Sequence, residues 1–485
     1  MQFANNDSMT KINLKQLTIQ KARESMERGE FSAEELTRAY LENIEVRNAE
    51  LNAYLTVFDD ALDEAKKIDE KRKKGEKMGA LAGIPVAIKD VIMVKGREVR
   101  GGSKILQGHI ATYDATAVCK LREAGAILLG MTNCDEFAMG ASGENSAYGP
   151  TKNPIDTSRV PGGSSSGSGV AVAGDMALTA LGSETGGSVR QPAAFTGLVG
   201  LKPTYGAVSR YGLLALCSSF DQIAPFGKTV ADVEAVFNVI AGQDHLDSTS
   251  LNPNLKPITY NLKPKIIGVP SDLPLEGCDS LVIENFKQQI EKLRELGYEM
   301  KDILLPNLKY AIPCYYIILP AEASANLARY DGLRYGAHVD GTNLLEDYMK
   351  TKGVGYGKEV RRRIILGTYV LSAGYYDAYY YQAMRVRELM KQDFTRAFET
   401  VDAIITPTTA GPAFKLGTKS KRSPIEMYLE DIFTAPANIV GVPAISVPSG
   451  AVREGDKDLP LGLQIIASHQ REDVCFNISK SFLGE

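Results

Sequence analysis

Hydrophobic and polar residues alternate along the chain in two patterns. From about residue 80 onward, short apolar runs are separated by longer segments with helical spacing. The apolar runs predict buried strands at "GIPVAIKD" (83–90), "GAILLGMTN" (125–133) and "MALTALGSE" (176–184). "ATAVCKLREAG" (115–125) predicts a helix that ends on a glycine. This alternation predicts an α/β fold, in which helices cover both faces of a sheet.

The same pattern returns in the second half of the chain. "KIIGVP" (265–270) reads as a strand, and it precedes a helix with apolar residues at Val282, Phe286, Ile290 and Leu293. Residues 310–400 read as mostly helical and rich in tyrosine. Strands are then expected at "VDAIITPTT" (401–409), "AISVPSG" (444–450) and "LGLQIIA" (461–467).

The N-terminal part, residues 13–75, reads as helical. One helix is expected to start at Ser32, because Glu35 follows three residues later and completes a capping box. The helical region ends in "KRKKG" (71–75), which has two interpretations. The four cations form a nucleic-acid patch, or they complement the dipole at a solvated helix end. We favour the helix end.

No linker, repeat or low-complexity tract divides the chain, so we expect one domain over residues 1–485. Within it, residues 1–78 would form N-terminal helices and 79–240 the core. Residues 241–400 would add an αβ and helical segment, and 401–485 would return as strands to the sheet.

Composition narrows the class of protein. The 485 residues are 44% hydrophobic with a net charge of −4, which gives no broad basic surface for nucleic acid. The six cysteines form no CxxC, so we expect free thiols in a reducing cytoplasm and no metal site. The N-terminus lacks the apolar core of a signal peptide, and Met9 is a second candidate start. No apolar run is long enough for a membrane span.

The stretch "VPGGSSSGSG" (160–169) has the composition of a phosphate loop but not its sequence. A P-loop requires a lysine after the glycines, where Val170 stands, and a dinucleotide fingerprint requires a third glycine where Val172 stands. Taken alone, the stretch is best interpreted as a serine-rich turn that caps the following helix.

A second glycine-rich stretch, "GSETGGSVRQPAA" (182–194), changes that interpretation. It follows an apolar run, and Pro192 suits the first turn of a helix. The backbone N–H groups of Thr185, Gly186, Gly187 and Ser188 would point at one spot, as in an oxyanion hole. Ser188 would be the nucleophile.

A serine nucleophile requires a base. The four histidines, at positions 109, 245, 338 and 469, lie outside both glycine-rich motifs. The alternative is Lys89 at the end of "GIPVAIK", where burial would lower the amine's pKa. The other interpretation of Lys89 is a strand-end lysine that reaches solvent.

Together, "GIPVAIKD", "VPGGSSSGSG" and "GSETGGSVRQPAA" resemble the motifs of the amidase signature family. The resemblance implies the amidase signature fold, with a large mixed β-sheet between helices, and a Ser–cis-Ser–Lys catalytic unit. Ser188 would form the acyl-enzyme, Ser164 would relay the proton from a cis peptide after Gly163, and Lys89 would be the terminal base. Ser166 departs from the family pattern, which has glycine there.

Further stretches resemble one subfamily, the A subunits of glutamyl-tRNA(Gln)/aspartyl-tRNA(Asn) amidotransferases. They are residues 135–154, 200–213, 322–336 and 357–380. The resemblance implies that glutamine is hydrolysed and that ammonia passes to a B subunit in a heterotrimer with a C subunit. ATP and Mg²⁺ would bind the B subunit, which would also hold most of the aminoacyl-tRNA. No cofactor is expected in this chain.

The subfamily resemblance also implies a glutamine site. Arg363 would bind the α-carboxylate and Asp431 the α-ammonium group, and Gly140 and Ser142 would line the pocket. Because successive helical residues point about 100° apart, only one arginine of "RRR" (361–363) is expected to face that pocket. The tyrosines at 375–381 are expected to pair at i,i+4 spacing on one helix rather than to stack on RNA bases.

Two other functions remain open. The chain could be a stand-alone amidase for a small amide with the same triad. It could also be a catalytically silent scaffold within a complex, although Lys89, Ser164 and Ser188 argue against that.

Overall fold

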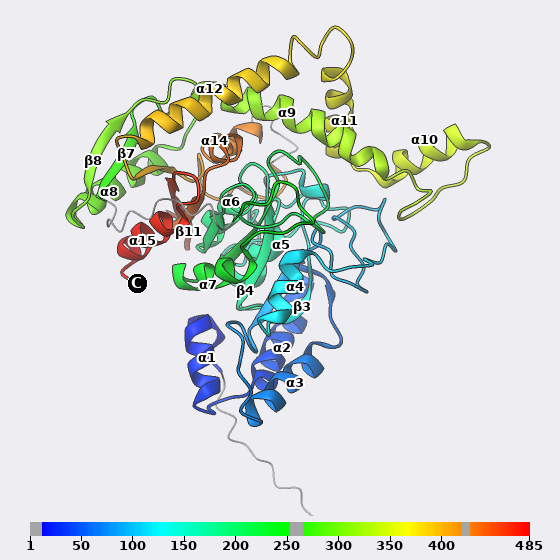
Figure 1. Cartoon of the computed structure of the whole chain (residues 1–485), viewed down its shortest axis with the longest axis vertical. Coiled ribbons are helices and arrows are strands. Elements are labelled where there is room, and N and C mark those ends of the chain that lie inside the picture. Colours follow the sequence, from blue (N-terminus) through cyan, green and yellow to red (C-terminus); the bar gives the residue numbers. More distant parts are fainter. Residues whose placement is uncertain (1–11, 253–264, 419–426) are drawn as a thin grey trace, which may run out of the picture.

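A mixed sheet runs through the molecule, and the expected strands lie within it. The computed structural model describes residues 12–252, 265–418 and 427–485, so Met9 lies outside the described residues. In this part of the chain eleven strands lie in the order β1-β3-β2-β4-β6-β5-β10-β11-β9-β7-β8 (Figure 1). They are β1 Tyr54–Val57, β2 Pro85–Lys89, β3 Ile127–Thr132, β4 Thr179–Glu184, β5 Val199–Lys202, β6 Gln222–Gly227, β7 Ile266–Pro270, β8 Glu299–Ile303, β9 Ala403–Pro407, β10 Ala444–Glu454 and β11 Lys457–Ala467.

Helices surround this sheet. Their bounds are α1 Ile19–Glu27, α2 Ala33–Leu51, α3 Ala61–Lys73, α4 Thr116–Glu123, α5 Ser166–Ala173, α6 Arg190–Thr196, α7 Val230–Ile240, α8 Ser280–Glu295, α9 Ala311–Asn326, α10 Leu344–Gly355, α11 Lys358–Val370, α12 Tyr380–Phe398, α14 Ala435–Val440 and α15 Glu472–Leu483. None of the helices in the described parts of the chain combines the length and apolar character needed to span a bilayer.

Alternate residues of the sheet belong to two different cores, which confirms that helices cover both faces. Ile404 and Ile466 pack in a core shared with α9, α12 and α14. Their neighbours Ile405 and Ile465 pack in a second core with α7, α8 and α15. Since successive side chains of a strand point to opposite faces, each layer of helices is held by its own set of residues.

The N-terminal region is helical with one exception. Ser32 is the N-cap of helix α2 and forms the predicted capping box, in which the Ser32 and Glu35 side chains each accept the backbone N–H of the other residue. The expectation of helix throughout residues 13–75 was wrong at β1, where Tyr54–Val57 pairs antiparallel with β3. The strand pairs with backbone N–H and C=O groups at the edge of β3, which would otherwise be exposed.

Three parallel strands, β2, β3 and β4, end at the same edge of the sheet. Strand β2 lies parallel to both β3 and β4, so the carboxyl ends of these three strands share one edge of the sheet. Lys89 is the last residue of β2, and Glu184 is the last residue of β4. The strand-to-helix turns that follow in an α/β sheet are the usual place for a ligand.

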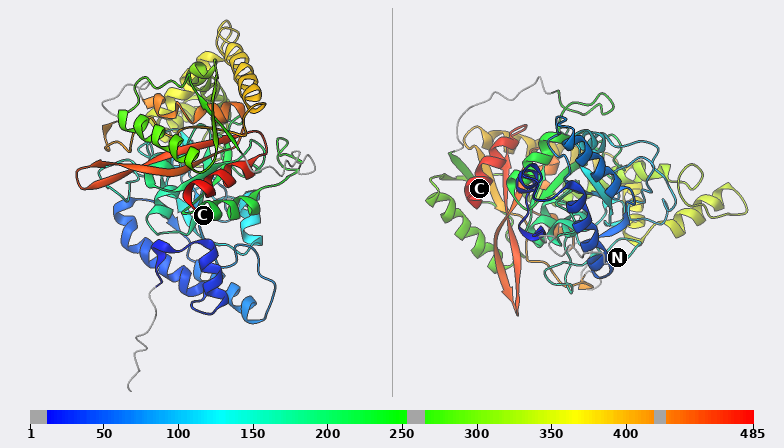
Figure 2. Two further views of the ribbon diagram at one scale, coloured as in Figure 1. Left: turned by 90° about the vertical axis from the view of Figure 1, so that its left-hand side faces the viewer. Right: turned by 90° about the horizontal axis from the view of Figure 1, so that it is seen from below.

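Two parts extend from the body. Helix α10 projects to one side (Figure 1), and the long β10–β11 hairpin extends past the strands beside it (Figure 2). The turn of the hairpin is exposed, whereas Ala444 and Ala467 at its base are fully buried. The predicted strands at 444–450 and 461–467 are therefore correct, but both continue into the hairpin.

Helices α9 and α11 approach closely at Gly367, which yields a stability prediction. A Cβ at Gly367 would lie 1.8 Å from the carbonyl oxygen of Pro320 in α9. Gly367→Ala should therefore lower the free energy of unfolding by about 1–3 kcal/mol, because the added methyl forces the helices apart. Chemical denaturation measures the change.

Gly353→Ala in α10 is the matched control, because no described residue outside the helix's own backbone has an atom within 4 Å of the added methyl. Alanine favours helix by up to about 1 kcal/mol over glycine, so this control should unfold no more easily than the wild type. Equal stability of Gly367→Ala and the wild type would contradict the packing described.

Candidate active site

Lys89 lies at the centre of a cluster of buried hydroxyl groups. The side chain is fully buried, and its Nζ lies 2.8 Å from Ser164 Oγ, 2.9 Å from Ser165 Oγ and 2.9 Å from Ser183 Oγ. Burial lowers the pKa of the amine to about 8. The interpretation of Lys89 as a lysine that reaches solvent is therefore wrong, because the strand end is covered.

Four oxygen atoms surround Nζ, because the Ser183 carbonyl oxygen also lies 3.3 Å away, and this set can serve an uncharged amine. The Ser165 hydroxyl donates to the Ser183 carbonyl oxygen at 2.9 Å, so its oxygen is free to accept from Lys89. The Ser183 hydroxyl oxygen accepts a second N–H of the Lys89 amine. A neutral amine has two N–H groups and one lone pair, so the lone pair is left for the hydroxyl proton of Ser164.

The three serines of the first glycine-rich stretch do not cap a helix. Helix α5 begins at Ser166, and no side chain hydrogen-bonds its first turn as a cap. The peptide bond between Gly163 and Ser164 is cis, as the resemblance implies. Ser166 has a helical backbone rather than a positive φ, so serine in place of glycine costs no backbone strain there.

Ser188 lies in the second glycine-rich turn, beside the first. Its carbonyl oxygen accepts the backbone N–H of Ser165 at 3.1 Å, which joins the two turns. Ser188 is buried, and only 7% of the residue's surface is exposed. Among the described residues, the Ser188 hydroxyl makes no hydrogen bond to that of Ser164. Catalytic hydrogen bonds are often longer before substrate binds.

Two side chains pack directly against the glycines of this second turn. A Cβ at Gly186 would lie 2.4 Å from the hydroxyl of Tyr315, and a Cβ at Gly187 would lie 2.3 Å from Thr434 Oγ1. Only glycine fits at either position. In the described residues, the backbone N–H groups from Thr185 to Ser188 have no protein acceptor, so they are free for a ligand oxygen.

A buried ion pair fixes the end of this turn. Glu184 accepts the backbone N–H groups of Val189 and Arg190, each at 3.0 Å, and the Arg190 side chain donates to the same carboxylate. Arg190 also donates to the carbonyl oxygen of Thr434 at 2.9 Å and to Asn438 Oδ1 at 2.6 Å. Both charges are fully buried and satisfied by several hydrogen bonds, as burial of ions requires.

Gly140 and Ser142 are the expected pocket residues. Asp135 connects the loop that carries them to the turn that carries Ser164. A Cβ at Gly140 would lie 2.4 Å from the Asp135 carboxyl carbon, and one at Gly163 would lie 2.9 Å from Ser142 N. Asp135 accepts the backbone N–H of Gly143 at 2.9 Å. This carboxylate therefore sets the path of the 140–145 loop against the turn that carries Ser164.

Arg363 and Asp431 lie in one cluster joined by tyrosines. The Arg363 guanidinium lies 5.4 Å from the Tyr316 ring centre and donates to Glu359 Oε1 at 2.9 Å. The Tyr316 hydroxyl donates to Asp431 Oδ2 at 2.7 Å. A Cβ at Gly187 would lie 3.4 Å from Asp431 Oδ1, so the cluster adjoins the Ser188 turn.

Only one arginine of "RRR" (361–363) is buried, as the helical spacing predicts. Arg363 is buried, whereas Arg361 and Arg362 are exposed on the other side of α11. Burial also raises the pKa of the Asp431 carboxyl to about 7. A cation beside Asp431 would restore its charge.

The histidines and the tyrosine run at 375–381 make other contacts. Among the histidines, the exposed His245 lies 3.9 Å from the buried Asp244, and His338 lies 3.2 Å from the exposed Asp340. His109 packs edge-on against Tyr335, and His469 lies beside Gly441. The tyrosine rings 375/379 and 376/380 do pair, but residues 371–379 form turns before α12 rather than one helix.

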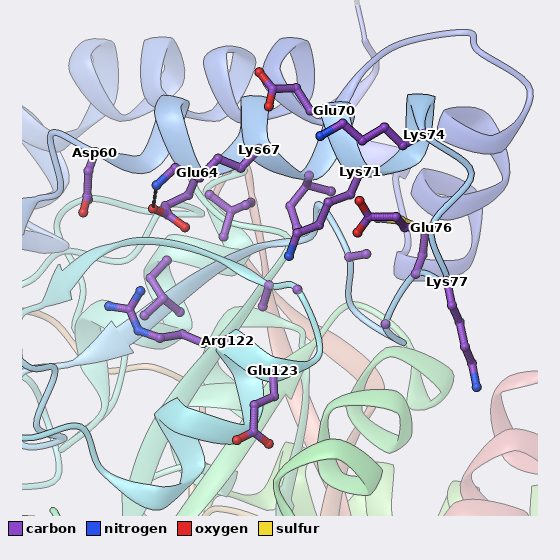
Figure 3. A pocket seen from close by; sticks show the side chains of 18 of the residues that line it. Asp60, Glu64, Lys67, Glu70, Lys71, Lys74, Glu76, Lys77, Arg122 and Glu123 are labelled. Carbon is purple, nitrogen blue, oxygen red and sulfur yellow. Dashed lines mark hydrogen bonds and ion pairs between the residues drawn. The ribbon is translucent and has the colours of Figure 1, made fainter.

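Two of the four cations of "KRKKG", Lys71 and Lys74, line a hollow of about 420 Å³ between α3 and α4, where they lie among acidic residues (Figure 3). Lys67 is paired there with Glu64 at 2.7 Å, and Glu70, Glu76 and Glu123 also line the hollow. The mixed charge favours the helix-end interpretation over a nucleic-acid patch.

Sequence reasoning missed Ser165, Ser183 and Tyr316. The serines lie inside the motifs, but nothing in the pattern shows that they contact Lys89 from 76 and 94 positions away. Tyr316 lies in an apolar helix whose sequence reads as core.

Comparison with known proteins agrees with this geometry. The family model described as Amidase matches residues 35–476. The A subunit of the glutamyl-tRNA(Gln) amidotransferase of Koribacter versatilis is 50% identical over 474 residues, which is 96% of this chain and 98% of that relative. The A subunit of the same enzyme from Thermoanaerobacter pseudethanolicus is 51% identical over 478 residues, covering 97% and 96%.

Solved structures show the same fold. The A subunit of the glutamyl-tRNA(Gln) amidotransferase of Thermotoga maritima is 39% identical with a TM-score of 0.79, covering 97% of this chain and 95% of that one. The peptide amidase of Stenotrophomonas maltophilia is 30% identical with a TM-score of 0.81, covering 97% of both chains. The sequence, the fold and the buried lysine–serine cluster together establish that this chain belongs to the amidase signature family.

Proposed function

We propose that this chain is the glutamine-hydrolysing component of a tRNA-dependent amidotransferase. It is an enzyme of the amidase signature family, and relatives about 50% identical over almost its whole length are glutamyl-tRNA(Gln) amidotransferase A subunits. The observation that carries the proposal is the 2.8 Å contact between the buried amine of Lys89 and the hydroxyl of Ser164, beside the turn that holds Ser188.

In the proposed mechanism a proton moves along these three side chains. The lone pair of neutral Lys89 accepts the proton of Ser164, and Ser164 accepts the proton of Ser188. Ser188 Oγ then attacks the side-chain amide carbon of glutamine. The C–N bond breaks, the relay returns its proton to the leaving ammonia, and water releases glutamate from the acyl-enzyme.

The turn 185–188 would stabilise the charge that forms on the carbonyl oxygen. Its free backbone N–H groups are already oriented by Glu184, Tyr315 and Thr434. Donors that need no reorganisation are usually the largest contribution to such catalysis, with one donor worth about 2.7–4 kcal/mol.

Arg363 and Asp431 would hold the two charged ends of glutamine. The guanidinium would bind the α-carboxylate, and the Asp431 carboxylate would bind the α-ammonium group. Gly140 and Ser142 would line the opposite side of the pocket, next to Asp135.

The partners follow from the subfamily. Ammonia would pass to a B subunit, which would use ATP and Mg²⁺ to convert Glu-tRNA(Gln), Asp-tRNA(Asn) or both to the amidated forms. A C subunit would complete the heterotrimer. The alternative is a stand-alone amidase, because peptide amidase shares this fold.

The first prediction from the proposed function concerns pH. Because burial lowers the pKa of Lys89 to about 8, its neutral fraction rises as the pH rises through that value. The kcat/KM for glutamine should therefore increase up to about pH 8 and then level off. Lys89→Arg should remove activity at every pH, because an arginine stays charged. A flat wild-type profile between pH 6 and 10 would contradict the role of Lys89.

The second prediction tests the function itself. The chain is co-expressed with candidate B and C subunits, and amidation of misacylated tRNA is measured with glutamine or with ammonium chloride as the nitrogen source. Ser188→Ala should abolish the glutamine-dependent reaction and leave the ammonium-dependent one, because only the supply of ammonia is lost. Robust hydrolysis of varied amides by the isolated chain, with no tRNA amidation by the complex, would support the stand-alone amidase instead.

The third prediction concerns substrate binding. Arg363→Ala should raise the KM for glutamine by about 10–100-fold, because a hydrogen bond to a charged group is lost. Arg361→Ala, two residues away on the exposed face of α11, is the matched control and should leave the KM near that of the wild type. Equal KM values for the two variants would reject the role of Arg363.

A further inference from the structure

The turn Leu216–Asp221 plays no part in the proton relay, yet it contacts the Ser188 turn. Asp221 is buried, and its Oδ1 accepts the Thr185 side-chain hydroxyl at 2.7 Å. Its Oδ2 accepts the backbone N–H groups of Leu216 and Cys217 at 2.8 and 2.9 Å. Both oxygens of one carboxylate are therefore used to join Thr185 to this turn.

The same turn supports the side chain that covers Gly186. The Phe220 ring stacks on that of Tyr315 with centres 5.9 Å apart and an angle of 20° between the planes. Ser219 donates its backbone N–H to Glu322 of α9, the helix that also carries Tyr315, at 2.9 Å. The turn is thus anchored to α9 as well as to Thr185.

The two ends of the 185–188 turn are held by different carboxylates. Glu184 fixes the far end through the N–H groups of Val189 and Arg190. Asp221 fixes the near end through the Thr185 side chain, and among the described residues the Thr185 backbone N–H has no acceptor. Glu184 is the last residue of β4, and Asp221 directly precedes Gln222, the first residue of β6, which is paired with Glu184.

We propose that the hydrogen bond from Thr185 to Asp221 is a positioning device that aims the backbone N–H groups of residues 185–188 at the reacting carbonyl oxygen. Thr185 acts through its backbone on the substrate and through its side chain on Asp221. The proposal rests on Ser188 being the nucleophile, but it does not depend on glutamine being the substrate.

The test compares three variants by two readouts. Thr185→Val keeps the shape of the side chain and removes its hydroxyl, whereas Thr185→Ser keeps the hydroxyl. Thr179→Val is the matched control, because Thr179 is a buried threonine of the preceding strand, β4, whose hydroxyl donates to the Phe226 carbonyl oxygen at 2.6 Å. Thermal unfolding first establishes that each variant is folded.

The first readout is glutamine hydrolysis by the complex with its B and C subunits. Thr185→Val should lower kcat by about 10–100-fold with less than a threefold change in KM, because misplaced donors act on the transition state. Thr185→Ser should recover most of that loss, and Thr179→Val should stay within about twofold of the wild type.

The second readout does not depend on the substrate. A small alkyl phosphonyl fluoride phosphonylates Ser188 as the Oγ–P bond forms, the P–F bond breaks, and fluoride leaves with the serine proton. Its P=O oxygen occupies the place of the oxyanion. Mass spectrometry of the intact chain should show labelling slowed at least tenfold in Thr185→Val and restored in Thr185→Ser.

The outcomes separate this inference from the proposed function. If the wild type is labelled at Ser188 but does not hydrolyse glutamine, the proposed function fails and the labelling rates still decide the role of Thr185. Labelling of Thr185→Val within threefold of the wild type would overturn the inference. So would an equal loss in Thr179→Val, or a wild type that is not labelled at Ser188.

Discussion

Burial of an amine among hydroxyl groups is the constraint on which the site depends. Lys89 ends a fully buried strand, and the low polarity around it favours the neutral form of the amine. The Ser165 and Ser183 hydroxyl oxygens accept N–H groups of this amine. Ser164 Oγ lies 2.8 Å from Nζ, and in the proposed mechanism the lone pair of the neutral amine accepts the Ser164 proton. An exposed lysine at this place would stay charged, and it would be a donor rather than a base.

The rest of the site follows from the sheet. Strands β2 and β4 lie side by side, so the lysine at the end of one is close to the turn after the other. The Glu184–Arg190 pair ties that turn to α14, and Asp221 ties it to the segment before β6. Ser188, the proposed nucleophile, therefore lies on a backbone held from two sides. The proposed glutamine ligands, Arg363 of α11 and Asp431 before α14, lie in the cluster that adjoins this turn.

Local patterns in the sequence predict the parts whose structure depends on near neighbours. The strand that ends at Lys89 and the capping box at Ser32 follow from apolar runs and spacing alone, and the structure has both. The edge strand β1 was missed, because four residues between two helices carry too little periodicity. The partners of Lys89 and Thr185 could not be predicted, because only the packing of distant strands brings Ser183 and Asp221 to them.

The central claim is that burial lowers the pKa of the Lys89 amine to about 8, so that its uncharged fraction near neutral pH is far larger than that of an exposed lysine. Its most direct test is an NMR titration of the chain with ¹³C-labelled lysine side chains, in which the Lys89 signal is assigned by its loss in Lys89→Arg. The account predicts a midpoint near pH 8, well below that of the exposed lysines. A Lys89 signal that titrates together with the exposed lysines, above about pH 10, would contradict it.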